Sequence, residues 1–177
     1  YFAINVSSPN TPNLRELQDK DSLKTLLGSI QQINLGKKKP PPVFLKIAPD
    51  ITTNQLDEII EVCITSHIDG IIATNTTISR ENLVTSKVKV DKLGSGGLSG
   101  SPLCKRSNDI LEYLNKNKTE NLKIISSGGV MSSKDIVNRL ASGADLVQLY
   151  TGFIYNGPGL IGNGKTELLK TTNLPPQ

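Results

Sequence analysis

The chain has 177 residues, of which 36% are hydrophobic and 20% charged, proportions typical of a soluble globular domain with its own core. Its 20 basic and 16 acidic side chains give a net charge of +4, and the basic residues are scattered apart from one KKK run at 37–39. Nucleic-acid-binding proteins usually carry a clustered basic face, and aromatic residues make up only 4% here, so we expect no nucleic-acid partner.

Few residues could bind a metal or form a disulfide. Cys63 and Cys104 stand in unrelated contexts and His67 is the single histidine, so we expect a reducing compartment and no metal site. His67 follows a helix-like segment, which predicts a surface or capping residue. No apolar run approaches the roughly 18 residues of a membrane span, and the first residues do not show the charged-then-apolar pattern expected of a leader. Tyr1 is not methionine and lies inside a strand-like run, so we expect a longer natural chain.

Five short apolar runs recur along the chain, and each is followed by small polar or glycine residues. Their continuous apolar character is typical of strands that are buried on both faces, as in a parallel sheet. The runs are FAINV (2–6), VFLKIA (43–48), DGIIAT (69–74), LKIIS (122–126) and DLVQLY (145–150).

Segments with apolar residues at three- and four-residue spacing alternate with these runs and predict helices. The segments are 21–33, 53–66, 104–114 and 132–143, and the last ends at Gly143, a typical helix stop. After Pro158, glycines at 159, 162 and 164 weaken helix formation, and the final NLPPQ is expected to fray. The candidate caps are Asp21 or Ser22, Thr52 or Thr53, and Ser132 or Ser133.

Strand and helix in alternation predict βα units around a parallel sheet, either doubly wound or five-eighths of a (β/α)8 barrel. The stretch KKKPPP (37–42) returns directly to the pattern, so we interpret it as a loop within a single domain. In both architectures the chemistry gathers at the carboxyl ends of the strands. Functional residues are therefore expected in the stretches that follow the apolar runs, which are SSPNT, APD, TNTT, SSGG and YTG.

Two glycine-containing stretches fit a phosphate site. SSGGV (126–130) ends a strand and precedes a helix, so its amides are expected to point at an anion at that helix start. YTGF (150–153) follows the last strand, and barrels often hold a phosphate between their last two βα loops. In contrast, GSGGLSGSPL (94–103) fails the dinucleotide fingerprint, because Ser99 replaces its third glycine. GLIGNGKT (159–166) matches the P-loop pattern, but too few residues follow it for the rest of that machinery.

Six motifs, in order along the chain from residue 1 to about 158, resemble the dihydroorotate dehydrogenase family, and more narrowly its class 2, quinone-using branch. They are NVSSPNTP (5–12), LKIAPD (45–50), DGIIATNTT (69–77), GGLSGSPL (96–103), SGGV (127–130) and LVQLYTGFIYNGP (146–158). The resemblance implies a TIM-type (β/α)8 barrel that binds FMN. The fourth to eighth βα units would be present, whereas the first three strands and the amino-terminal membrane-docking helices would be absent.

The resemblance also implies an activity, which is the oxidation of dihydroorotate to orotate in pyrimidine (UMP) biosynthesis. Hydride would pass from C6 to FMN, and electrons would then pass to a quinone. A peripheral membrane location is implied, at the cytoplasmic face of a bacterial inner membrane or at the mitochondrial inner membrane. Two alternatives stay open: a class 1 or related soluble FMN barrel, and a non-catalytic truncated remnant.

Three residues are expected to act in the reaction. The resemblance implies that Ser8 is the base that takes the C5 proton, where class 1 enzymes carry cysteine. An isolated serine hydroxyl is a weak base, so Thr11 is expected to link it to a water molecule. Lys46 interrupts an apolar run, where an unpaired ammonium is costly, and a cation near flavin N1 and O2 would stabilise the developing charge. We therefore expect Lys46 at the flavin.

The other expected site residues bind cofactor or substrate. A carboxamide can donate and accept, which suits the edge of a pyrimidine ring. The resemblance implies FMN contacts for Asn5, Thr74, Ser99, Gly100, Gly128, Gly129, Tyr150 and Thr151, and orotate contacts for Asn10, Asn75 and Thr76.

One residue departs from the family pattern. Asn13 stands where the family usually has glycine, and asparagine tolerates a left-handed backbone.

Overall fold

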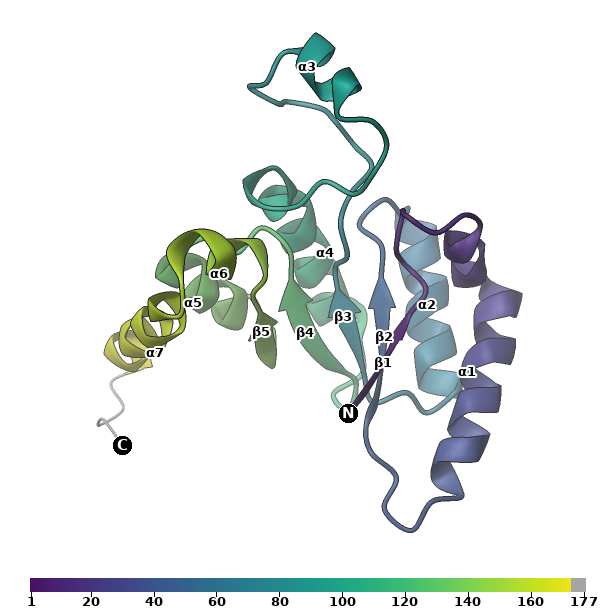
Figure 1. Cartoon of the computed structure of the whole chain (residues 1–177). Coiled ribbons are helices and arrows are strands. Elements are labelled where there is room, and N and C mark those ends of the chain that lie inside the picture. Colours follow the sequence, from purple (N-terminus) through teal and green to yellow (C-terminus); the bar gives the residue numbers. More distant parts are fainter. Residues whose placement is uncertain (173–177) are drawn as a thin grey trace.

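The computed structural model describes residues 1–172 and contains a five-stranded parallel sheet (Figure 1). The strands lie in the sheet in their chain order, and each neighbouring pair is parallel. In a doubly wound sheet the order in which strands are added reverses partway through the chain, whereas in a barrel each new strand is added beside the previous one. The observed order therefore favours the barrel over the doubly wound sheet. The strands are β1 (Phe2–Asn5), β2 (Val43–Ile47), β3 (Gly70–Ala73), β4 (Lys123–Ser127) and β5 (Leu146–Gln148).

Helical segments connect the strands at the predicted places. Thr52 and Ser132 each form a reciprocal capping box at the start of a helix, which confirms them as caps. Within residues 1–172, no helix combines the length and apolar character that crossing a membrane requires. The α-helices are α1 (Lys20–Leu35), α2 (Thr53–Thr65), α3 (Lys87–Lys92), α4 (Cys104–Asn117), α5 (Ser133–Ala141), α6 (Thr151–Asn156) and α7 (Gly159–Thr172), and the 3-10 helices are η1 (Leu14–Gln18) and η2 (Ser101–Leu103).

The first long helix begins earlier than predicted. Its N-cap residue is Asp19, not Asp21 or Ser22, because η1 ends at Gln18 and Asp19 supplies the one extended residue between the two helices. Asn13, just before η1, has φ 60°, so it does adopt the left-handed conformation that asparagine tolerates.

The last helix contradicts the expectation that its glycines would weaken it. α7 runs without a break through all three glycines and contains the whole P-loop-like stretch 159–166, so no phosphate-binding loop forms there. Gly164 lies against α5, and a Cβ built on it would lie only 2.5 Å from Cδ1 of Ile136. Close packing of the two helices therefore outweighs the low helix propensity of glycine. The predicted fraying of NLPPQ falls outside the described residues.

The helix-covered face of the sheet carries the main core. Leu45, Ile71 and Ile124 are fully buried, and they pair in register across β2, β3 and β4. They belong to one cluster with Leu27 of α1 and Leu111 of α4. Burial of these side chains supplies the main driving force that holds the helices on the sheet.

The opposite face of the sheet carries a second, smaller cluster. Phe44, Ile72 and Ile125 form this cluster apart from the main core. Lys46 lies two residues after Phe44 and pairs in register with Ile72, so it lies on this same face. In a barrel this face lines the interior, so Lys46 lies inside, near the carboxyl end of its strand.

Candidate active site

The carboxyl ends of β2 to β5 surround a pocket of about 350 Å³. In Figure 1 the arrowheads of β2, β3 and β4 point toward the side of the molecule that carries the α3 loop. Ten of the predicted site residues line this pocket, although they come from segments far apart in the sequence. They are Lys46, Thr74, Asn75, Thr76, Ser99, Gly100, Gly128, Gly129, Tyr150 and Thr151.

The motif after β1 lies beside this pocket and is hydrogen-bonded to its wall. Oδ1 of Asn5 accepts a hydrogen bond from Nδ2 of Asn75 (3.2 Å). Ser7 is fully buried between these two residues, because its Oγ donates to Oδ1 of Asn5 (2.9 Å) and accepts from Nδ2 of Asn75 (3.1 Å). Asn5, the predicted flavin contact, and Asn75, the predicted substrate contact, therefore share one polar network. No role was predicted for Ser7 from the sequence.

The remaining residues of this motif lie farther toward solvent. Ser8 is half-buried, and its Oγ accepts from the amide of Asn10 (3.2 Å). The side chain of Asn10 reaches the glycine-rich stretch 94–103, where its Oδ1 accepts a hydrogen bond from the amide of Gly97 (3.2 Å). Thr11 is exposed, and its carbonyl accepts from the amide of Leu14 (3.4 Å). None of these three lines the pocket itself, so their roles remain predictions.

Lys46 is a half-buried cation in the pocket wall. No carboxylate in the described part of the chain forms an ion pair with it. Burial disfavours the charged ammonium and lowers the pKa of Lys46 below its ordinary value. An anionic group placed in the pocket would relieve this cost, so the position suits the charge predicted for a reduced flavin.

The turn at Gly128 and Gly129 requires glycine for two reasons. Both residues have positive φ values, 103° and 73°. A Cβ on Gly128 would lie 2.8 Å from Cδ2 of Leu103, and one on Gly129 would lie 2.2 Å from Cα of Cys104. The amide N–H groups of Gly129 and Val130 donate to no acceptor within residues 1–172. These amides are available to a bound anion such as a phosphate.

The amides without an acceptor belong to the predicted stretch 126–130. The start of the following helix is less available to an anion, because α5 closes its own first turn. The amide of Asp135 donates to Oγ of Ser132 (3.2 Å), and Oδ2 of Asp135 accepts from the amides of Met131 (3.0 Å) and Ser132 (2.9 Å). This capping box satisfies donors that a phosphate would otherwise use, so the glycine turn supplies the free amides instead.

A hydrogen bond in the pocket wall joins two segments that were considered separately in the sequence. Oγ1 of Thr151 donates to Oγ of Ser99 (3.0 Å). Gly100 has φ 81°, and a Cβ on it would lie 3.1 Å from Cγ2 of Thr151. The stretch 94–103, which failed the dinucleotide fingerprint, therefore still contributes to the pocket.

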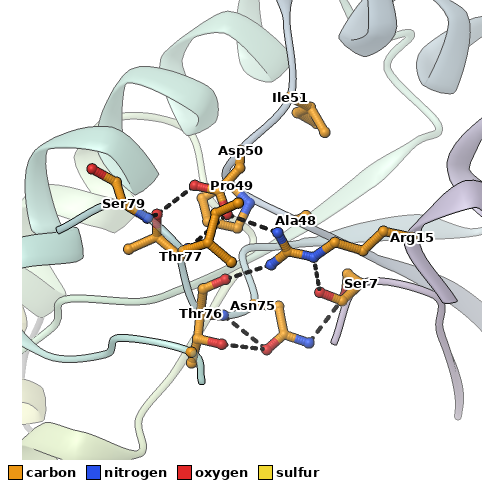
Figure 2. Close-up of polar contacts among 12 residues, drawn as sticks. Ser7, Arg15, Ala48, Pro49, Asp50, Ile51, Asn75, Thr76, Thr77 and Ser79 are labelled. Carbon is orange, nitrogen blue, oxygen red and sulfur yellow. Dashed lines mark hydrogen bonds and ion pairs between the residues drawn. The ribbon is translucent and has the colours of Figure 1, made fainter. Parts of the chain in front are cut away.

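Arg15, for which no role was predicted from the sequence, connects three strand-end loops (Figure 2). Its Nε donates to the carbonyl of Ser7 (3.0 Å), its Nη1 to Oδ2 of Asp50 (2.9 Å) and its Nη2 to the carbonyl of Thr76 (2.9 Å). Asp50 in turn accepts from Oγ1 of Thr77 and from the amide of Ile78 (3.0 Å). The loops after β1, β2 and β3 are thus held together beside the pocket. The available signal was Asp50, which lies in the quoted LKIAPD motif but received no role.

Five further residues line the pocket without having been predicted. Gln148 offered a signal similar to that of Lys46, because it is a polar side chain inside an apolar run. The others looked like ordinary structural residues in their motifs. The set is Leu103, Ser127, Val130, Gln148 and Leu149.

The single histidine lies away from this pocket, as predicted. His67 directly follows α2 with φ 54°, and its carbonyl accepts a hydrogen bond from the Gln31 side chain. Among residues 1–172, no group of three or more His, Cys, Asp or Glu side chains is arranged to hold a metal ion.

Known proteins resemble this chain over nearly its whole length. A family model described as dihydroorotate dehydrogenase matches residues 1–171. A relative from Christiangramia forsetii, named dihydroorotate dehydrogenase (quinone), is 52% identical over 170 residues, covering 96% of this chain and 49% of its own length. A relative of the same name from Thermosynechococcus vestitus is 42% identical over 174 residues, covering 96% of this chain and 46% of its own length.

Solved structures give the same result. A crystal structure of DHODH from Eimeria tenella in complex with ferulenol matches with a TM-score of 0.89 and 35% identity, covering 98% of this chain and 50% of that one. The neighbours are TIM barrels, so the predicted barrel class is confirmed. The chain spans about half the length of these relatives.

Proposed function

The chain belongs to the dihydroorotate dehydrogenase family, and we propose on this basis that it forms the carboxyl-terminal part of one FMN-binding barrel domain. The proposed reaction is the oxidation of dihydroorotate to orotate in pyrimidine biosynthesis, with a quinone as the electron acceptor. The observation that carries the proposal is that ten predicted cofactor and substrate residues line one and the same pocket. The relatives named dihydroorotate dehydrogenase (quinone) support the choice of acceptor.

The pocket residues fit the parts of FMN. When bound, FMN supplies the hydride-accepting ring and passes the electrons on to the quinone. Gly128 and Gly129 would hold the phosphate, because the turn leaves amides without protein acceptors. Lys46 would lie beside the pyrimidine part of the flavin, where its unpaired charge stabilises negative charge.

The loops after β1 and β3 would bind and deprotonate the substrate. Asn75 and Thr76 line the pocket, and Asn75 is fixed by its hydrogen bond to Asn5. Ser8 would take the proton from C5, with Thr11 linking it to water. Ser8 accepts a hydrogen bond from the amide of Asn10, which fixes the position of its Oγ. A base must be held in position before its pKa matters, so this contact supports the assignment.

We also propose a peripheral membrane location for the whole protein. The electron acceptor of the relatives is a quinone, and respiratory quinones are dissolved in membranes. The docking elements would belong to the portion of the relatives that this chain does not cover. A class 1 enzyme, the main alternative, would carry cysteine in place of Ser8.

Flavin binding and substrate-driven reduction test this proposal together. We expect the purified chain to bind FMN, and dihydroorotate added without oxygen to bleach the flavin absorbance. Ser8→Ala should keep FMN affinity within about twofold, because Ser8 lies outside the pocket lining, while bleaching slows by about 10²–10⁴-fold, the usual contribution of a general base. Ser29→Ala, on the exposed side of α1, is the control and should change neither property.

Three results are informative. Absence of FMN binding would contradict the proposed function and favour the non-catalytic alternative. FMN binding with undiminished bleaching in Ser8→Ala would overturn the assignment of the base alone. Bleaching of the wild-type chain by a substrate other than dihydroorotate, but not by dihydroorotate, would favour another flavin barrel.

A further inference from the structure

Arg139 carries a buried guanidinium group that is hydrogen-bonded to the glycine turn, Gly128–Gly129. The residue lies on α5 and is only 2% exposed. Its Nη2 donates to the carbonyls of Gly128 (3.0 Å) and Cys104 (3.0 Å) and to Oγ of Ser107 (2.7 Å), and its Nη1 donates to Oγ of Ser126 (3.3 Å). The remaining contact is with Sγ of Cys104 (3.7 Å). All of these acceptors are neutral.

The positive charge of Arg139 is therefore not balanced by the protein around it. No carboxylate within residues 1–172 forms an ion pair with it. Asp135 is one turn earlier on the same helix, but its carboxylate accepts from the amides of Met131 and Ser132. A buried charge is costly unless it is paired, so an external anion would supply the missing partner.

The contact with Gly128 also orients the turn. The Gly128 carbonyl accepts hydrogen bonds from both Arg139 and Ser107 (2.7 Å from its Oγ). In a trans peptide unit the carbonyl and the following N–H point in opposite directions. The N–H of Gly129 therefore points away from Arg139. Both glycines line the pocket, and the amides of Gly129 and Val130 have no acceptor in the described part of the chain.

We propose that Arg139 is a positioning residue for a phosphate monoester bound at the Gly128–Gly129 turn. It holds the Gly128 carbonyl away from the anion and places a buried positive charge behind the amides that bind it. The inference rests on the proposed function, in which this anion is the phosphate of FMN. It predicts that Arg139 gives the pocket its preference for FMN over riboflavin, which has the same ring system but no phosphate.

The ratio of the affinities for FMN and riboflavin tests this inference. We expect the wild-type chain to prefer FMN by about 10- to 100-fold, as for hydrogen bonds to a charged group. Arg139→Gln should reduce this preference by about tenfold and leave riboflavin affinity within about twofold. Arg139→Lys keeps the charge but has a single ammonium for four oxygen partners, so it should reduce the preference by about threefold. Lys134→Gln, exposed on the same helix, is the control and should leave the ratio unchanged.

A purely structural role for Arg139 predicts a different pattern. If the residue only joins α4, α5 and the turn, its replacement would weaken FMN and riboflavin binding equally, and this result would overturn the inference. Circular dichroism would report whether each variant folds. If Arg139→Gln does not fold, Arg139→Lys decides, because an unchanged preference in that variant also overturns the inference.

The wild-type chain separates the inference from the proposed function. If it binds riboflavin but shows no preference for FMN, the inference fails while the flavin pocket stands. Absence of all flavin binding would contradict the proposed function itself and the inference with it.

Discussion

Ser7 and Ser8 are adjacent in the sequence but have different surroundings. Ser7 is fully buried and bonds to Asn5 and Asn75, so it fixes the wall of the pocket. Ser8 is half-buried, and its described hydrogen bond is accepted from the amide of Asn10. Because the Ser8 hydroxyl has no buried network to maintain, it is the better candidate of the two for chemistry. A serine pair in the sequence does not show this division, since it depends on which side each side chain faces.

Lys46 gives a prediction at the scale of one residue. Its folded-state pKa is lowered by burial, so the folded chain releases this proton before the unfolded chain does as the pH rises. The cost of burying the charge is therefore fully present at neutral pH and disappears as the pH rises through the folded-state pKa toward the unfolded-state value. Lys46→Met should be more stable than wild type at neutral pH, and this difference should shrink at alkaline pH. Its FMN affinity should fall about 10- to 100-fold.

Urea unfolding at several pH values and FMN titration would measure these effects. Lys24→Met, on the exposed face of α1, is the control and should show neither the pH-dependent gain nor the loss of affinity. A stability difference for Lys46→Met that is the same at every pH would contradict the role of desolvation. Unchanged FMN affinity would contradict the placement at the flavin.

At the scale of elements, the pocket depends on how the strand-end loops are joined. Parallel pairing brings the carboxyl ends of β1, β2 and β3 to one edge of the sheet, but the loops that follow are irregular. Arg15 joins all three loops through different nitrogens (Figure 2). Its ion pair with Asp50 is largely buried, with side chains 21% and 19% exposed. This contact therefore fixes the relative positions of Ser7, Asp50 and Thr76.

Replacement of Arg15 should destabilise the chain. Arg15→Ala should lower the free energy of unfolding by about 2 kcal/mol, because it leaves partly buried acceptors without a donor. Arg15→Lys should lose most of this stabilisation as well, since one ammonium cannot reproduce three directions of donation. Lys105→Ala removes an exposed ion pair with Asp109 and should cost about 0.5 kcal/mol or less. Urea unfolding of the three variants measures the difference, and equal effects of Arg15→Ala and Lys105→Ala would refute the joining role.

At the scale of the whole molecule, the sheet formed by residues 1–172 has two open edges. β1 and β5 each pair with one neighbour, whereas β2, β3 and β4 pair on both sides. The edge strands are also more exposed than β3, which is buried at all four residues. A closed barrel has no edges. The chain matches about half the length of its relatives, which is consistent with the five units being part of a closed barrel.

The open edges predict uneven protection from hydrogen exchange in this chain. Backbone amides of β3 should exchange at least about tenfold more slowly than those of β5, equivalent to ~1.4 kcal/mol in opening free energy. The reason is that β3 is held by ladders on both sides and by the main core. Hydrogen exchange read by mass spectrometry or NMR checks this directly. Equal exchange across the five strands would show that the sheet opens only as a unit.

Much of the fold and of the pocket could be predicted from local patterns. The type of each element follows from its apolar spacing, which is why all five strands and the main helices were found. Ten pocket residues were found because they lie in short motifs directly around strand ends. The unbroken course of α7 was not predicted, because Gly164 lowers the stability of an isolated helix. Its lack of a side chain is an advantage only where α7 packs closely against Ile136 of α5.

The amino-acid sequence was enough to establish alternating βα units, the family motifs and the chemistry that each strand end can offer, because these are local properties of neighbouring residues. The apolar pattern alone left a doubly wound sheet and a barrel open, the family motifs implied the barrel, and the order of strands in the folded sheet agrees with the barrel. The same holds for the partners of Arg15, which are up to 61 residues away, and for those of Arg139, which are up to 35 residues away. Such contacts exist only after the chain has folded, since packing and not sequence spacing determines which distant groups meet.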